Sequence, residues 1–378
     1  MQTELQRIPW SVVALSTAIT AIGLSALLRA DELYGDSKLF ERQVIWLMLS
    51  WPAMFAVTRI PYRSIRPLSF WFYGICVVLL VVTLFMPASN GARRWIPLGL
   101  LDFQPSEPSR LAVILALAFY LMHRENHRTV PGLIPPLIMT LVPLLLVLKE
   151  PDLGTAMLFL PVLYAMLFAA GSRTQHLLIA AAAGIALIPV LWWQMSAEQK
   201  SRVVTVFTQR DGGTAPAGDG FHLHQSKQVM ALGGGLGSIA RDEPLIDDPN
   251  AWQLPAARTD FIFSIIGERY GIPGCAILLT LYMALLVRGL QIARATREPF
   301  GRLVAVGIVT MIATQVVINT GMTVGLMPIT GITLPLCSYG GSSLLSTSIA
   351  LGLLMNIAMR PGYEVTGEPF AFSVKSSV

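Results

Sequence analysis

The sequence predicts an all-α, polytopic membrane protein with about ten transmembrane helices and one long extracytoplasmic loop. Hydrophobic residues make up 54% of its 378 residues and charged residues only 13%, whereas soluble domains carry about 25% charged residues. Arginines fall mostly in alternate short loops, at 59–66, 124–128, 173, 288–302 and 360, which places both termini in the cytoplasm. The apolar runs that can cross a bilayer lie near 9–28, 43–60, 67–86, 108–122, 133–148, 153–170, 175–195, 260–287, 302–324 and 333–358.

The remaining composition excludes several classes of function. The formal net charge of +5 is spread over short loops rather than gathered on one face, so nucleic-acid binding is not indicated. The three cysteines lie in apolar runs without metal-ligand spacing and are predicted to pack in the core. Arg7 precedes the first run as in a signal peptide, but this run is longer than a signal h-region and more runs follow, so we expect an uncleaved anchor.

Polar side chains crowd the membrane edge after the third apolar run. A helix N-cap formed by Ser106 explains the serine, but it does not explain the charged residues around it. Glu107 and Arg110 stand three residues apart, hence on one helical face, where they can pair. The two arginines of the loop suit lipid headgroups and a substrate phosphate equally well. The group comprises Arg93, Arg94, Trp95, Gln104, Ser106, Glu107 and Arg110.

Two histidines on the cytoplasmic side, His123 and His127, have the four-residue spacing of zinc ligands on a helix. They lack a third ligand and the order of residues found in zinc proteases, so a solvated loop is predicted there.

The fifth and sixth runs meet in a tight outer turn rich in charge. Pro151 ends the first helix and Asp152 can cap the next. Lys149 is left unexplained by these local roles, and its ammonium group is well placed for a phosphate.

The long segment 196–259 is predicted to lie outside the membrane. Residues 197–207 can form an amphipathic surface helix, 211–220 read as flexible, and 225–232 look helical again. The glycine run 233–237 follows no strand, so it is not a dinucleotide fingerprint. A loop this long usually serves as a lid or a binding surface.

Asp260 closes this polar segment and opens a long apolar run, so it should sit where water meets the bilayer. Placing a carboxylate at such a position costs free energy, so acidic residues found there usually have a function. A helix cap, formed by Thr259 or Asp260, is an equally good interpretation from the pattern alone, and the two roles are compatible.

The last hydrophobic stretch, 319–344, contains prolines, glycines and hydroxyl residues at membrane depth. Such residues predict broken helix or re-entrant backbone that is buried in protein or lines a cavity, although packing through small residues explains part of the pattern. Free backbone N–H groups at Gly340, Gly341 and Ser342 are candidates for holding an anion. The tail 361–378 reads as disordered and cytoplasmic.

Five motifs, in order and spacing, resemble the SEDS family of cell-wall proteins (shape, elongation, division and sporulation). They are Gly91–Gly99, Phe103–Glu107, Pro151–Thr155, Thr259–Phe263 with Gly267-Glu268, and Met327–Leu344. The resemblance covers nearly the whole chain, so residues 1–378 are expected to form a single transmembrane domain. Two features favour the elongation (RodA) branch: the sequence of the Phe103–Glu107 motif, and the short segments that precede the first apolar run and follow the last one. The division (FtsW) branch is the alternative.

The resemblance implies a peptidoglycan glycosyltransferase of the bacterial cytoplasmic (inner) membrane. Such an enzyme polymerises lipid II, an undecaprenyl-linked disaccharide, on the outer face, with a class B penicillin-binding protein and other elongation proteins as partners. Asp260 matches the essential acid of the family, and Glu107 and Arg110 match a paired Glu and Lys. Other departures from the family pattern are Glu150 for glutamine, Arg258 for histidine and Arg269 for glutamate.

For this reaction we expect Asp260 to act as general base in a single inverting displacement. The leaving pyrophosphate is expected to meet Arg94, Arg110 and Lys149, with a divalent cation (Mg²⁺ or Mn²⁺) as a possible cofactor that no ligand spacing proves. The full candidate set comprises Asp260 as catalytic residue and, for substrate binding, Arg94, Trp95, Gln104, Ser106, Glu107, Arg110, Lys149, Asp152, Thr155, Ser338, Gly340 and Ser342.

Two rival functions remain at this stage. A lipid II flippase would need polar residues along the whole crossing, and many transporters carry internal repeats, whereas here the charges gather at the outer ends of spans. A non-enzymatic scaffold would leave the shared membrane level of Asp260, Glu107, Arg110 and Lys149 unexplained.

Overall fold

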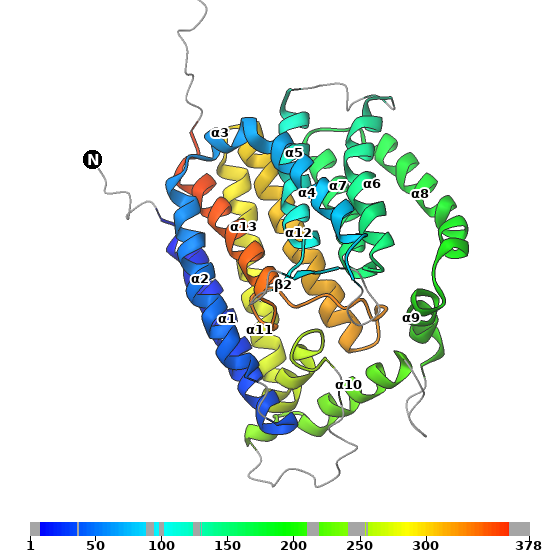
Figure 1. Ribbon diagram of the computed structural model, residues 1–378. Helices are drawn as coiled ribbons and strands as arrows, with labels where there is room; N and C mark the ends of the chain where they lie inside the picture. Colours follow the sequence, from blue (N-terminus) through cyan, green and yellow to red (C-terminus); the bar gives the residue numbers. More distant parts are fainter. Residues whose placement is uncertain are drawn as a thin grey trace, which may run out of the picture.

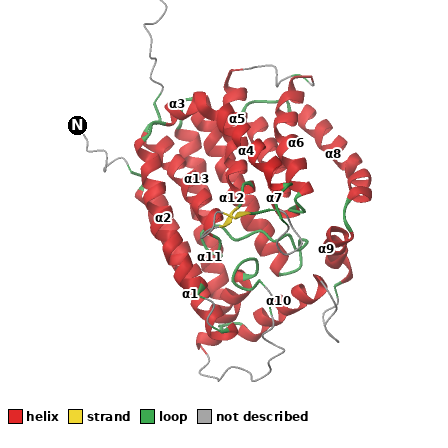
Figure 2. Ribbon diagram, viewed as in Figure 1, coloured by secondary structure: helices red, strands yellow, loops and turns green. Residues whose placement is uncertain are grey.

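The computed structural model describes residues 8–35, 38–87, 94–97, 102–123, 129, 131–209, 219–240, 254 and 256–362. Helices dominate these residues, as Figure 2 shows. The helices are α1 (Trp10–Tyr34), α2 (Leu39–Arg59), α3 (Tyr62–Ile65), η2 (Arg66–Leu68), α4 (Ser69–Thr83), α5 (Ser106–His123), η4 (Pro131–Leu133), α6 (Ile134–Lys149), α7 (Leu153–Ala169), α8 (Thr174–Gln194), α9 (Ala197–Thr208), α10 (Asp219–Gly233), η5 (Ser238–Ala240), α11 (Ile262–Ala295), α12 (Pro299–Thr323) and α13 (Gly341–Met359). The strands in this part of the chain, β1 (Ile96–Pro97) and β2 (Asp102–Phe103), form one short antiparallel ladder that pairs Ile96 with Phe103.

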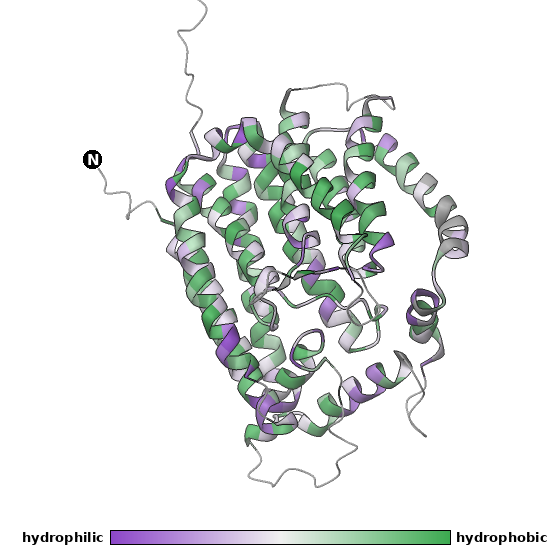
Figure 3. Cartoon of the chain, viewed as in Figure 1, coloured by the Kyte–Doolittle hydropathy of each residue, from purple (hydrophilic) through white to green (hydrophobic). Residues whose placement is uncertain are grey.

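The predicted all-α, polytopic fold is confirmed, and every predicted span coincides with a helical segment. Within the described residues, six segments are long and apolar enough to cross a membrane: Trp10–Tyr34, Tyr62–Thr83, Pro131–Lys149, Ile262–Ala295, Pro299–Thr323 and Gly341–Met359. Two shorter apolar helices, Leu153–Ala169 and Thr174–Ala186, accompany them. Hydrophobic residues cover these helices, whereas hydrophilic residues gather along α10 and at helix ends (Figure 3).

The helices α11, α12 and α13 occupy the middle of the molecule (Figure 1). In that view α1 and α2 lie on one side of them, α5 and α7 on the other, and α8, α9 and α10 form an outer arc. Small residues allow close helix packing: a Cβ on Gly352 of α13 would lie 2.3 Å from the carbonyl oxygen of Met54 in α2. The backbones of α2 and α13 therefore pack directly against each other at this contact.

The last predicted span begins later than the apolar pattern suggests, because residues 324–340 are not helical. This broken backbone was expected from its prolines and glycines. A second break interrupts α11 at Gly271, where φ is +62°. The N–H of Ile272 there donates to the carbonyl of Gly235 at 3.1 Å, so the break in α11 makes room for the turn that follows α10.

The two helices predicted within 196–259 correspond to α9 and α10. The helix α10 is fastened to the membrane bundle: the Ser226 hydroxyl lies 2.7 Å from that of Ser264 and donates to the carbonyl of Thr323 at 2.9 Å. The flexible segment predicted at 211–220 falls almost entirely outside the described residues, as does the tail beyond residue 362.

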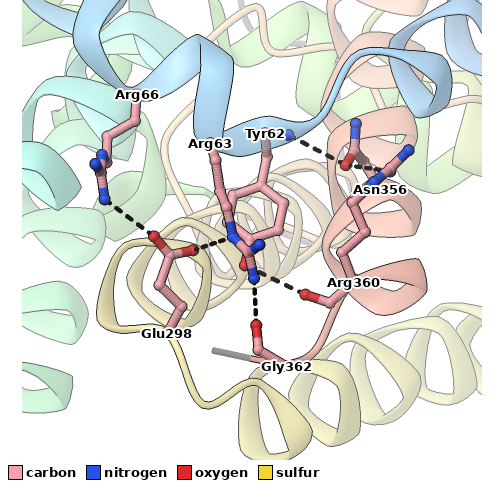
Figure 4. Close-up of polar contacts among 7 residues, drawn as sticks. All are labelled: Tyr62, Arg63, Arg66, Glu298, Asn356, Arg360 and Gly362. Atoms are coloured by element: carbon pink, nitrogen blue, oxygen red, sulfur yellow. Dashed lines mark hydrogen bonds and ion pairs between the residues drawn. The ribbon is translucent and has the colours of Figure 1, made fainter. Parts of the chain in front are cut away.

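At the far end of the bundle from α10, a polar cluster joins the α2–α3 connection to α12 and α13 (Figure 4). Asn356 of α13 is fully buried; its Nδ2 donates to the carbonyls of Val57 and Ile60, and its Oδ1 accepts from the N–H of Tyr62 at 3.3 Å. Beside it, Glu298 pairs with Arg66 at 3.3 Å, and Arg63 lies 3.9 Å away. Buried side chains thus fix the turns at this end.

Candidate active site

Asp260 lies in a tight turn immediately before α11. The N–H groups of Thr259, Asp260 and Phe261 all donate to the carbonyl of Ala256, at 3.1, 3.0 and 3.2 Å. Phe261 occupies the N-cap position of α11, and no side chain caps that helix. The capping interpretation of Thr259 and Asp260 is therefore wrong, because the turn satisfies its own backbone and leaves the Asp260 carboxylate for another role.

Two neighbours define the surroundings of Asp260. The Nδ2 of Asn319 in α12 donates to the backbone carbonyl of Asp260 at 2.8 Å and to that of Ile332 at 2.7 Å. Gly331 has a φ of +73°, and a Cβ on it would lie 3.6 Å from Oδ2 of Asp260. The carboxylate therefore lies over the irregular loop that precedes α13. Asn319 is absent from the sequence-based candidates, although an asparagine within an apolar helix is a usable signal.

Burial raises the pKa of the Asp260 carboxyl to about 6. A hydrogen bond from Thr259 and the charges of Arg94 and Arg202 act in the opposite direction, whereas the charge of Asp152 adds to the rise. The carboxyl thus remains mostly ionised at neutral pH, and it is a stronger base than an aspartate in water.

Asp152 caps α7, as the sequence predicts. Its Oδ1 accepts from the N–H of Thr155 at 3.1 Å, and its Oδ2 accepts from the Thr155 hydroxyl at 2.9 Å and from Nε2 of Gln104 at 3.2 Å. Arg94 lies 4.0 Å from Oδ1. Asp152 is therefore a structural hub whose oxygens are already engaged.

Arg94 is anchored to the turn between α6 and α7. Its Nε donates to the carbonyl of Glu150 at 3.1 Å, and its Nη2 donates to that of Pro151. Both acceptors are neutral and the ion pair with Asp152 is long, at 4.0 Å, so the guanidinium can still pair with an anion.

Glu150 lies in the same turn with its side chain fully buried. One of its oxygens accepts from the hydroxyl of Thr83, and the other has no hydrogen-bond partner among the described residues. Desolvation raises the pKa of this carboxyl to about 8, against the hydrogen bond from Thr83 and the charge of Arg94. The nearby Asp152 reinforces the rise.

Glu107 and Arg110 form the ion pair expected from their spacing, in the first turn of α5. Both side chains are buried, with 7% and 4% exposed, and Ser106 beside them is fully buried. Arg110 also interacts electrostatically with Asp152. This pair therefore lies on the flank of the Asp152 hub.

The α7 cap and the Asp260 turn meet on one loop. A Cβ on Gly154, two residues after Asp152, would lie 2.6 Å from the carbonyl oxygen of Thr330 and 2.5 Å from Cγ1 of Ile332. Residues 330–332 therefore touch both α7 and the Asp260 turn. One site consequently gathers the following candidates: Arg94, Gln104, Glu107, Arg110, Asp152, Thr155 and Asp260.

The remaining candidates lie in the loop before α13 or at the edge of the site. The N–H of Gly340 donates to Oε1 of Gln43 at 3.3 Å, and the Ser338 hydroxyl accepts from the N–H of Leu334 at 2.9 Å. The prediction of a free N–H at Gly340 is therefore wrong, because a buried glutamine of α2 uses it. Ser342 is buried in the first turn of α13. Lys149 is exposed at the end of α6, and Trp95 is 37% exposed.

No group of three or more His, Cys, Asp or Glu side chains gathers among the described residues. A resident metal held by the protein alone does not fit this donor set. Mg²⁺, however, commonly takes one or two carboxylates and completes its shell with water and substrate phosphates. Asp260 fits such a role better than Asp152, whose oxygens are engaged.

Comparison with known proteins gives concordant results. The FtsW/RodA/SpoVE family, described as "Cell cycle protein", matches residues 6–362. A probable peptidoglycan glycosyltransferase FtsW of Geobacter sulfurreducens is 32% identical over 370 residues, covering 94% of this chain and 96% of that protein. The stage V sporulation protein E of Bacillus subtilis is 34% identical, with 93% and 97% covered. The peptidoglycan glycosyltransferase MrdB of Escherichia coli is 34% identical, with 85% and 86% covered.

Solved structures resemble the chain over most of its length. One, described as showing the structural coordination of polymerization and crosslinking by a peptidoglycan synthase complex, has a TM-score of 0.78 at 33% identity and covers 93% of this chain and 97% of its own. The rod shape determining protein RodA of Thermus thermophilus has a TM-score of 0.70 at 30% identity, with 94% and 98% covered.

Proposed function

Because the chain belongs to the FtsW/RodA/SpoVE family and is a multi-pass membrane peptidoglycan glycosyltransferase, we propose that it polymerises lipid II during cell elongation. The reaction takes place on the outer face of the cytoplasmic membrane, with both termini of the chain in the cytoplasm. The observation that carries this proposal is the Asp260 carboxylate, which has no capping role and lies within electrostatic range of Arg94 and Arg202.

The proposed reaction is one inverting displacement. The C4 hydroxyl oxygen of one lipid-linked disaccharide attacks the anomeric carbon of the growing chain, and the bond from that carbon to undecaprenyl pyrophosphate breaks. A sugar hydroxyl is a weak nucleophile, so Asp260 accepts its proton as the new glycosidic bond forms. The pyrophosphate leaves with the electron pair of the broken bond.

The leaving group carries negative charge into a site of low polarity, where fixed cations are most effective. Arg94 suits this task because its anchors are backbone carbonyls, and its closest carboxylate oxygen, on Asp152, lies 4.0 Å away. Arg110 contributes from within its ion pair with Glu107, and the exposed Lys149 can meet a phosphate at the rim. Gln104 and Thr155 keep Asp152 in place, and Trp95, which follows Arg94 and is 37% exposed, would contact the sugar.

A divalent cation is part of the proposal. Asp260 would hold it together with the pyrophosphate, and the ion would supply further positive charge to the leaving group. The same carboxylate would still accept the proton.

The elongation role rests on the Phe103–Glu107 motif and on the likeness to a RodA structure. Relatives named FtsW, stage V sporulation protein E and MrdB match at similar identity, so division is the second candidate role. The likeness to a peptidoglycan synthase complex supports a class B penicillin-binding protein as partner.

The test uses the purified protein with its penicillin-binding partner in liposomes that contain lipid II. Two quantities are measured on the same vesicles: glycan polymer formed, and lipid II transferred between leaflets. We expect polymer without transfer. Transfer without polymer would establish the flippase alternative, and neither activity would leave the scaffold alternative standing.

A further inference from the structure

We propose that Asn319 is a positioning residue for catalysis, because its side chain fixes the turn that carries Asp260 against the loop 330–332. This inference rests on the proposed function, since it assigns a task to a second residue of the same site. The residue does not touch the reacting atoms and acts through the backbone of Asp260.

The first argument is burial. Asn319 is fully buried in α12, and a buried amide destabilises a fold by about 1–3 kcal/mol when its hydrogen bonds are not made. An apolar side chain would serve mere packing better. The NH₂ group of Asn319 is therefore explained by its two acceptors, while Oδ1 has no hydrogen-bond partner among the described residues.

The second argument is the choice of partners. One Nδ2 group donates to the carbonyl of Asp260 at 2.8 Å and to that of Ile332 at 2.7 Å. These carbonyls belong to two irregular segments, one before α11 and one after α12, and neither oxygen is a partner in helix hydrogen bonding at this point. A single nitrogen thus sets the spacing between both segments.

The third argument is the position of the carboxylate. A Cβ added to Gly331, the neighbour of Ile332, would lie 3.6 Å from its Oδ2, and residues 330–332 also pack on the start of α7. The distance from the base to Arg94 and Asp152 therefore depends on the register that Asn319 sets. Small displacements of a catalytic group lower rates steeply, by as much as about 100-fold for 1 Å.

The chain offers a matched control at the opposite end of the bundle. Asn356 is equally buried and also donates its Nδ2 to two backbone carbonyls, those of Val57 and Ile60 (Figure 4). Loss of the NH₂ group removes two contacts to backbone carbonyls at either position, while Oδ1 of Asn356 also accepts from Arg360 at 2.7 Å. Only the loss at Asn319 should impair the chemistry of the correctly folded molecules.

The experiment compares Asn319→Asp with Asn356→Asp in the complex with the penicillin-binding partner. Each change keeps the size of the side chain and removes the NH₂ group but adds a carboxyl, so Asn319→Leu, which adds no charge, is measured beside them and should show the same loss as Asn319→Asp. We expect kcat for lipid II polymerisation, per folded molecule, to fall roughly 10- to 100-fold for Asn319→Asp with KM within about threefold. We expect Asn356→Asp to stay within about twofold of wild type. Equal losses in both variants, or wild-type kcat in Asn319→Asp, would overturn the proposal.

Hydrogen exchange supplies a readout that does not depend on activity. Backbone N–H groups of residues 256–261 and 332–338 should exchange faster in Asn319→Asp than in wild type, and should be unchanged in Asn356→Asp. Unchanged exchange in Asn319→Asp would refute the positioning role even if activity were lost. If wild type made no polymer while exchange behaved as expected, the proposed function would fail and the structural clamp would stand.

Discussion

Replacing Glu150 by glutamine should stabilise the protein at alkaline pH and leave its fold intact. The carboxyl is fully buried in the turn between α6 and α7, with a contact to Thr83 and one oxygen that has no partner among the described residues. Its pKa of about 8 means that the group is mostly protonated at pH 7. A protonated glutamate is neutral and similar in shape to glutamine, the residue that the family pattern has here.

The sign of the effect follows from proton linkage. The folded pKa of about 8 lies above the ordinary value of 4.5, so the folded protein binds the extra proton more tightly. The stabilisation is fully present below pH 4.5 and is lost as the pH rises to 8. At about 1.4 kcal/mol for each pKa unit, the loss is at most about 5 kcal/mol. Glutamine does not titrate and shows no such loss.

Thermal unfolding of the purified protein between pH 5 and pH 8.5 measures this difference. The Tm difference between Glu150→Gln and wild type should widen by several degrees as the pH rises, since 1 kcal/mol shifts Tm by roughly 1–2 °C in a chain of this length. Glu41→Gln, which alters an exposed acid of α2, provides the control and should follow wild type. Parallel Tm curves for Glu150→Gln and wild type would refute the reasoning.

Three further outcomes are expected. The polymerisation rate should fall about tenfold for each pH unit below 6, because Asp260 must be ionised to accept a proton; a flat profile from pH 7 to pH 5 would contradict this. Arg29→Ala should lower the free energy of unfolding by about 3–5 kcal/mol, because it leaves the buried carboxylate of Glu268, which Arg29 binds at 2.7 and 3.0 Å, without its ion-pair partner. Chemical denaturation measures this loss, and a loss below about 1 kcal/mol would contradict the prediction. Gly154→Val should lower the free energy of unfolding by about 1–3 kcal/mol and reduce the polymerisation rate, because the valine side chain would overlap the loop at Thr330. An unchanged polymerisation rate would show that this contact does not affect the reaction.

The sequence was sufficient for features that depend on neighbouring residues. Apolar runs predicted the helices, the position of Asp152 after Pro151 predicted its cap on α7, and the three-residue spacing predicted the pair of Glu107 and Arg110. Each of these follows from local geometry, which composition and spacing encode directly.

Features that join distant segments could not be predicted in this way. The bond from Gln43 to Gly340 spans 297 residues, and the ion pair of Arg29 with Glu268 spans 239. The local sequence pattern was equally consistent with Asp260 as a helix cap and as a general base. Only the structure shows the turn at 256–261, whose own backbone hydrogen bonds exclude the capping role. An asparagine within an apolar helix signals a buried polar role, but the partners of Asn319, the carbonyls of Asp260 and Ile332, could not be predicted because they lie in other parts of the chain.

The central claim is that Asp260 is the base of a lipid II polymerase. The most direct measurement is the initial rate of glycan formation from lipid II at pH 7.5 by wild type and Asp260→Asn, each with its penicillin-binding partner and each shown to be folded. The account predicts a loss of about 100-fold or more, the scale at which general bases contribute. A rate for Asp260→Asn above about one tenth of wild type would contradict it.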